Sequence, residues 1–207
     1  NKGLLLGFYL TGEKRYLDLA VKIADRICLV DGLDWKEPKT YGLAIVGVLT
    51  GYEATGDLKY LNRAKEIAYN LLDLQKRNNG IIPGDFIYQT GLAVEGLVEY
   101  YRWEKDPKVL AGIKEAVDYQ IYCYWDQEAG YIKAQEGLTF TSALALLYKE
   151  TKKHTYLDVA VTQVTKFVEE ARHMNAREVA LSYRNITALF DPALFIETET
   201  ENLPNQE

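Results

Sequence analysis

The chain has few residues of the kind that build covalent or metal-bound frameworks: only two cysteines and two histidines among 207 residues. Cys28 and Cys123 are too few for the disulfide network that holds small secreted domains together, and they are compatible with a reducing or an oxidising compartment. The cysteine content therefore does not indicate a cellular compartment. With 48% hydrophobic residues, the chain can instead bury a full hydrophobic core.

The chain also lacks a basic excess and a long hydrophobic run. Its formal net charge is −6, and Lys and Arg alternate with Asp and Glu, so no basic stripe is available for phosphate backbones. A membrane-spanning helix needs roughly 20 consecutive apolar residues, and no stretch approaches that length. We expect neither a nucleic-acid partner nor a membrane span.

No motif of several common enzyme classes is present. The P-loop pattern, G-x-S-x-G, H-E-x-x-H and aspartate-rich prenyl-diphosphate motifs are all missing from these residues. This argues against nucleotide, serine-hydrolase, zinc-protease and terpene chemistry in the segment, and we expect no cofactor. The chain starts at Asn1, almost at once inside an apolar helix, which suggests a fragment or a processed product.

What the chain does have is an internal repeat. One phrase occurs four times: TGEKRYLDLAVKIAD from Thr11, TGDLKYLNRAKEIAY from Thr55, EKDPKVLAGIKEAVD from Glu104 and TKKHTYLDVAVTQVT from Thr151. Its anchor leucines are Leu17, Leu61, Leu110 and Leu157, at steps of 44, 49 and 47 residues. Self-similarity at such a period is typical of stacked structural units.

Each repeat predicts two helices. The phrase itself has apolar residues at helical spacing with charged residues between them, which predicts a helix with one face in water. The segment before it is apolar nearly all round and rich in small residues, which predicts a buried helix. The turn between the two is short, with breakers at Gly12, Gly56 and Asp106-Pro107. The return connections are longer and span residues 29–40, 76–89 and 124–137.

The phrases TGDLKYLNRAKEIA and YQTGLAVEGLVEYY are similar to repeats of the six-hairpin (α/α) toroids found in glycoside hydrolases, polysaccharide lyases and sugar epimerases. This resemblance covers residues 3–190. It implies an all-α toroid, here an incomplete ring of about nine helices with the last near 179–190. We expect the helical domain over 1–195 and a polar tail or linker over 196–207. An open solenoid is the alternative fold, but glycines favour a crowded centre, namely Gly42, Gly47, Gly51, Gly91 and Gly96.

The resemblance also implies a site, because the active cleft of such toroids is lined by the loops that enter the inner helices. The candidate catalytic carboxylates in those loops are Asp34, Glu37, Asp85 and Asp126. A glycosidase needs two carboxylates, about 5 to 5.5 Å apart for retention or about 6.5 to 9.5 Å for inversion. The alternative is that these acids cap helices or close turns, as DQEAG from Asp126 suggests for a β-hairpin.

Aromatic and polar residues of the same loops, with a group further along the chain, are the candidate substrate-binding residues, since sugar rings stack on aromatic side chains. They are Trp35, Tyr41, Phe86, Tyr88, Trp125, Tyr131, Glu136, His173, Tyr183 and Arg184. We expect a domain that acts on or binds an oligosaccharide or glycan, with hydrolysis favoured. The first alternative is a non-catalytic helical-repeat domain that binds a protein partner or supports a larger assembly.

A second alternative is a polysaccharide lyase or uronosyl epimerase domain, with His173 or Tyr183 as the base and Arg184 neutralising the substrate. Cys28, Cys123 and His173 could in principle supply a zinc set. The two cysteines lie two hairpins apart, however, so we expect no metal site and interpret both as small core residues.

Overall fold

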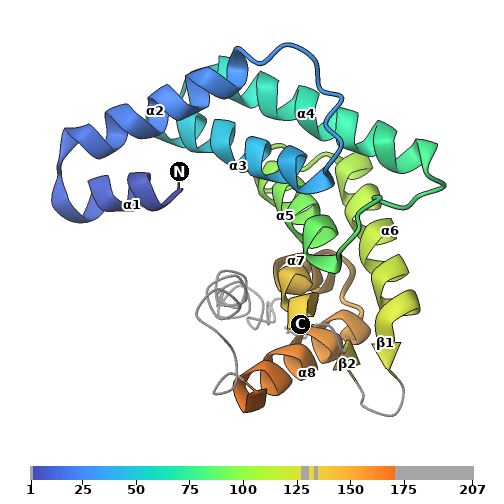
Figure 1. Cartoon of the computed structure of the whole chain (residues 1–207). Helices are drawn as coiled ribbons and strands as arrows, with labels where there is room; N and C mark the ends of the chain where they lie inside the picture. Colours follow the sequence, from blue (N-terminus) through green and yellow to red (C-terminus); the bar gives the residue numbers. More distant parts are fainter. Residues whose placement is uncertain (1, 127–130, 133–134, 171–207) are drawn as a thin grey trace, which may run out of the picture.

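The computed structural model describes residues 2–126, 131–132 and 135–170, and this part of the chain is built almost entirely from helices (Figure 1). The predicted all-α class is confirmed. No helix in these ranges is long and apolar enough to cross a membrane. The helices are α1 (Lys2–Thr11), α2 (Lys14–Cys28), α3 (Pro38–Thr55), α4 (Leu58–Arg77), α5 (Ile87–Glu104), α6 (Pro107–Tyr124), α7 (Thr141–Thr151) and α8 (His154–Glu170).

Consecutive helices pair into four hairpins, and in the last three the two helices differ in burial as the repeat predicts. The prediction of a buried first helix is wrong for α1, in which Leu5 alone is buried and no hairpin precedes it in the described residues. α3 and α5 are buried along most of their length, because their side chains are apolar or small on nearly every side. α4 buries only one stripe, which includes Ala64, Ile67 and Leu71, and exposes Lys65 and Glu66 between the first two of these. Substantial contacts join neighbouring hairpins, so the four follow one another along a curve (Figure 1).

Glycines set the close approach of α3 and α5 at the centre of the molecule. A Cβ atom built on Gly96 would lie 2.4 Å from the Cα atom of Gly42, and one on Gly42 would lie 1.9 Å from the Leu92 carbonyl oxygen. Gly91 faces Thr139 in the same way. The predicted close approach of buried helices is confirmed for Gly42 and Gly96. Gly91 instead faces the 3-10 helix that contains Thr139, and Gly51 faces Ala24 of the exposed helix α2.

The four short turns share one geometry. Each places a residue with left-handed backbone just after the buried helix, and its N–H donates to the carbonyl oxygen four residues earlier. These residues lie five positions before the anchor leucines, and they are Gly12, Gly56, Lys105 and Lys152. The breakers predicted in the first two turns are therefore confirmed, while the last two turns use lysine at the position that glycine favours.

The long connections also follow the prediction. Residues 29–37 join α2 to α3, and residues 78–86 join α4 to α5. After α6, strand β1 (Trp125–Asp126) pairs antiparallel with β2 (Tyr131–Ile132), and the 3-10 helix η1 (Gln135–Phe140) leads into α7. The predicted β-hairpin is thus confirmed at its two strands. The helix predicted near 179–190 and the tail predicted over 196–207 lie outside the described residues.

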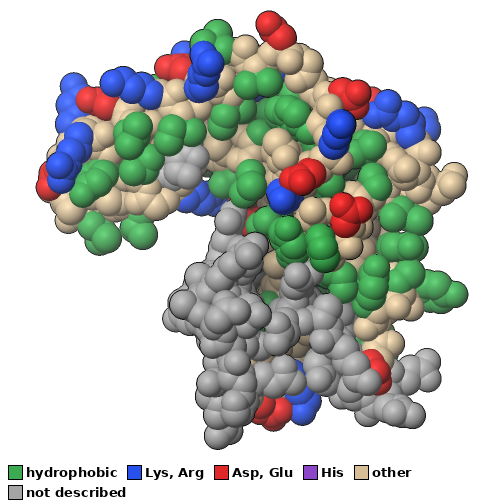
Figure 2. All heavy atoms as spheres, in the orientation of Figure 1, with side chains coloured by type: hydrophobic (Ala, Val, Ile, Leu, Met, Phe, Trp, Pro, Cys, Tyr) green, Lys and Arg blue, Asp and Glu red, His purple; other side chains and the backbone are tan. Residues whose placement is uncertain are grey.

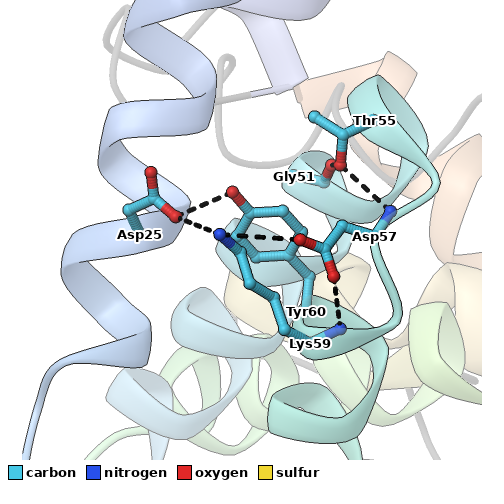
Figure 3. A network of polar contacts seen from close by, with 6 residues as sticks. All are labelled: Asp25, Gly51, Thr55, Asp57, Lys59 and Tyr60. Carbon is cyan, nitrogen blue, oxygen red and sulfur yellow. Dashed lines mark hydrogen bonds and ion pairs between the residues drawn. The ribbon is translucent and has the colours of Figure 1, made fainter.

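Hydrogen bonds at equivalent positions connect the outer helices of successive hairpins. The Tyr60 hydroxyl donates to Asp25 Oδ1 over 2.8 Å, and the Lys59 ammonium lies 2.9 Å from the same oxygen (Figure 3). Tyr156 donates to Asp118 over 2.8 Å in the same way. The accepting aspartates both stand eight residues after an anchor leucine, and the tyrosines stand directly before the next one.

The junction between α4 and α6 reverses the direction of this bond. Val109 occupies the position of the tyrosines, and Tyr69 occupies the position of the aspartates. Tyr69 donates to Asp106 Oδ2 over 2.7 Å, and the other oxygen of Asp106 accepts from the Lys108 N–H and caps α6. Each junction therefore has one tyrosine hydroxyl and one carboxylate, supplied from opposite sides.

Candidate functional site

The loop before α3 is held by a buried tyrosine. The Tyr41 hydroxyl accepts from the Trp35 N–H over 3.1 Å and donates to the Leu33 carbonyl over 2.5 Å, while its ring meets the Trp35 ring edge-on with centroids 4.9 Å apart. Tyr41 is only 1% exposed. Tyr41 therefore fixes the loop, and the half-buried Trp35 is the ring nearer to solvent; a contact of Tyr41 with substrate stays a prediction.

Lys39, in the first turn of α3, links this loop to the next hairpin. Its Nζ atom lies 2.8 Å from Glu37 Oε2 and 5.7 Å from the centre of the Tyr88 ring on α5. The hydrogen bond to Glu37, with a smaller effect of Tyr88, raises the pKa of Lys39. Two candidate residues from different repeats, Glu37 and Tyr88, thus come together around a lysine that the sequence interpretation missed.

The start of α5 carries a pair of stacked aromatic rings. Phe86 and Tyr88 have centroids 5.9 Å apart and planes inclined by 22°, and Phe86 is 58% exposed. The Asp85 N–H donates to the side-chain oxygen of buried Gln89 over 3.0 Å, which positions the backbone entering the helix. We call Trp35, Glu37, Lys39, Phe86 and Tyr88 the α3–α5 rim.

The carboxylates of the first two loops do not act as helix caps. The N-cap residues of α3 and α5 are Glu37 and Phe86, and neither side chain makes a capping hydrogen bond. The alternative that the loop acids cap these helices is therefore wrong. Asp34, Glu37 and Asp85 are all exposed, so their carboxylates are accessible from solvent along the rim.

The third loop is described only in part. Trp125 is half-buried and packs against the hydrophobic core, and Asp126 is half-buried opposite Tyr131 in the β1–β2 pair. A core-packed ring offers less surface to a ligand than Phe86 does. The side chains of Tyr131 and Glu136, and all of His173, Tyr183 and Arg184, lie outside the described residues.

The cysteines occupy different environments. Cys28 packs against the core, as predicted, and burial raises the pKa of its thiol. Cys123 is exposed near the end of α6, so its prediction as a core residue is wrong. Within the described ranges, no three His, Cys, Asp or Glu side chains are grouped to hold a metal ion.

Residues of α4 and α6 line a hollow on the surface of the described chain. Its floor is the Gln75 side chain, whose Nε2 donates to the carbonyl oxygens of Gly80 and Gly112 over 2.9 and 3.0 Å. The first bond holds the loop after α4 and the second holds α4 against α6, so this glutamine has a structural role. The rim is therefore the better candidate for a binding site.

Comparisons with protein families, curated proteins and solved structures found no match to this chain. The resemblance of the repeat phrases to six-hairpin toroids accordingly stays a prediction.

Proposed function

We propose that this chain is a carbohydrate-binding domain of the (α/α) toroid type, in which the α3–α5 rim binds an oligosaccharide or glycan. The stacked pair of exposed Phe86 and half-buried Tyr88 carries the proposal, because the apolar face of a sugar ring packs well on such a surface. Glu37 and Lys39 lie beside it and supply an acceptor and a donor for sugar hydroxyl groups.

Hydrolysis is the finer form of this proposal, and it assigns different roles to the carboxylates. Glu37 is already in an ion pair with Lys39, an arrangement that suits a hydrogen-bond acceptor or a base better than a proton donor. The proton donor would then be Asp34 or Asp85, which are both free of helix-capping roles. Asp126 of the third loop completes the set of candidates.

A glycan array tests binding, with Phe86→Ala as the informative variant. We expect this variant to lose binding up to about tenfold, since an aromatic contact of this kind is worth about 0.5 to 1.5 kcal/mol beyond the area it buries. Tyr122→Ala is the matched control, because Tyr122 is 87% exposed on α6. Equal loss in both variants, or no loss in Phe86→Ala, contradicts the proposal.

Release of reducing ends from any glycan that binds tests hydrolysis separately. Asp34→Asn, Glu37→Gln and Asp85→Asn should each retain binding, and at least one should lose turnover by a factor of about 100 or more. Binding without turnover in the unmodified protein leaves the binding proposal intact and removes the hydrolytic one. A new unsaturated product instead identifies the lyase alternative.

A further inference from the structure

An apolar stripe is exposed on the first hairpin. Leu19 and Ile23 of α2 are 47% and 36% exposed, and Tyr16 lies on the same face one turn earlier. On α1, Leu6 and Leu10 are 56% and 77% exposed. Figure 2 shows green side chains gathered over this hairpin. Contiguous exposed apolar surface of this kind marks an interaction site in a soluble fold.

The repeat shows what normally covers these positions. Ile23 stands six residues after its anchor leucine, and the residues at the same place in the other hairpins are Ile67, Ala116 and Gln163. They are 0%, 1% and 4% exposed. Likewise Leu19 corresponds to Val159, which is 4% exposed. In each later hairpin the outer helix buries this stripe, and each of those hairpins has another hairpin before it.

Leu6 of α1 gives a similar result. Leu6 corresponds to Thr50 of α3 and Leu146 of α7, which are 0% and 7% exposed. Leu6 of α1 and the stripe of α2 therefore present, in repeat register, side chains that the later hairpins bury or half-bury. These exposed positions of the first hairpin are thus the positions through which the later hairpins pack against the hairpin before them. Leu10 does not add to this argument, because its counterparts Trp103 and Glu150 are exposed as well.

The polar part of the junction is also present. Lys59 and Tyr60 hold the Asp25 carboxylate, with Nζ 4.6 Å from the centre of the Tyr60 ring. Arg15 and Tyr16 are the corresponding residues of the first hairpin, with the guanidinium carbon 5.0 Å from the centre of the Tyr16 ring and Nη2 3.5 Å from its hydroxyl. Arg15 and Tyr16 thus form the same pair of a cationic side chain and a tyrosine ring that Lys59 and Tyr60 form.

We propose that the α1–α2 face is a docking surface for one further helical hairpin of this repeat. The outer helix of that hairpin presents an Asp or Glu carboxylate to Arg15 and Tyr16, as α2 presents Asp25 to Lys59 and Tyr60. Its apolar side chains cover Leu19 and Ile23. The partner is defined by this chemistry: an amphipathic helical pair with an acid eight residues after its anchor leucine.

The end of a second copy of this chain does not meet that description. The described part of α8 has Thr165 eight residues after its anchor, where α2 and α6 have Asp25 and Asp118. A threonine hydroxyl brings no charge to pair with Arg15. The charge on the docking face therefore selects an additional, acidic hairpin and not the α8 end of another copy.

An extended chain tests the proposal. Residues 2–45 are placed directly before Lys2, so that the added α2, its loop and the first turns of α3 lead into α1. The register is kept because Lys2 and Val46 stand at the same distance before their anchor leucines. We expect the added hairpin to stack on the original α1–α2 face and raise the Tm by about 4 °C or more.

Two variants in the original copy show whether the rise comes from this interface. Leu19→Asp should abolish most of the rise in the extended chain and change the Tm of the unextended chain by less than about 2 °C. Tyr16→Phe, which keeps the ring packed on Gly7, should remove a smaller share of the rise in the extended chain only. Lys22→Gln, on exposed α2 surface, is the control matched in charge, because it also lowers the net charge by one unit.

Three results overturn the proposal. The first is an unchanged Tm on extension, and the second is a rise that survives Leu19→Asp. The third is a dimer of the unextended chain in sedimentation that Leu19→Asp disrupts, because that result assigns the face to a second copy. Loss of glycan binding at the rim affects neither the Tm nor the sedimentation result, so failure of one proposal does not imply failure of the other.

Discussion

Gly42 and Gly96 lie against each other where α3 crosses α5. At either position, a side chain larger than a hydrogen atom would not fit between the two backbones. Glycine costs each helix about 1 kcal/mol of propensity relative to alanine. The close approach repays this by bringing the first turns of α3 and α5 near enough for Lys39 to reach Tyr88.

Gly96→Ala should therefore destabilise the protein by about 2 to 3 kcal/mol, since overpacking outweighs the gain in helix propensity. Chemical denaturation measures the change. Gly3→Ala is the control, because a Cβ atom at Gly3 meets nothing within 4 Å and α1 there is exposed. That variant should be neutral or slightly more stable, and similar losses in both would show that the crossing is not the cause.

Lys152→Gly should stabilise the protein by about 1 kcal/mol, because a residue with a Cβ atom is strained in the left-handed region that glycine adopts freely. Lys152 has φ of 56°, at the position that Gly12 and Gly56 occupy in their turns with φ of 70°. The neighbouring Lys153→Gly has no left-handed conformation to relieve and should give no gain. The free energies of unfolding of the two variants give a direct comparison.

Acid should weaken the junction between α2 and α4. The hydrogen bonds from Lys59 and then Tyr60 lower the pKa of Asp25 from its ordinary value of 3.8. A carboxyl with a lowered folded pKa stabilises the protein fully above its unfolded pKa, and this stability is lost as the pH falls through the folded pKa. The Tm difference between the unmodified protein and Asp25→Asn should thus be largest near neutral pH and shrink below about pH 4.

Asp18→Asn on the exposed face of α2 is the matched control for that experiment. Its Tm should differ little from that of the unmodified protein across the same range. A constant difference for Asp25→Asn at every pH would mean that the substitution acts through packing and not through the charge.

The two cysteines should react at different rates with iodoacetamide. Cys123 is exposed, whereas Cys28 packs against the core and burial raises the pKa of its thiol, which lowers its thiolate fraction. Mass spectrometry of the native protein should show Cys123 modified first by a factor of about ten or more. Cys123→Ser should leave only the slow reaction, and both sites should react alike in denaturant.

Periodicity predicted the hairpins well, because a 3.6-residue pattern and the position of glycine are local properties of the chain. Lys105 and Lys152 show a limit of that approach. Their equivalence to Gly12 and Gly56 is visible in the aligned phrases, but a search for glycine and proline passes over a lysine in a left-handed turn. Alignment of the repeats locates the left-handed turn residues better than residue type does.

The site was predicted less completely, for a different reason. That the loops before α3 and α5 share one end follows from alternating helix direction, but the contact of Lys39 with Tyr88 depends on how the two helices cross. From the sequence, Tyr41 is likewise an aromatic residue that could bind a ligand. Only its hydrogen bonds to Trp35 and Leu33 show that its side chain holds the loop before α3.

The neighbour-to-neighbour arrangement of the hairpins also has a consequence for local unfolding. A hairpin at the end of such a row opens by breaking one interface, whereas α3 and α5 are held from two sides. Opening free energy should then rise from α1 and α2 towards the glycine crossing. Amide hydrogens would exchange in that order, which makes the two helices that carry the rim the slowest-exchanging part of the described chain.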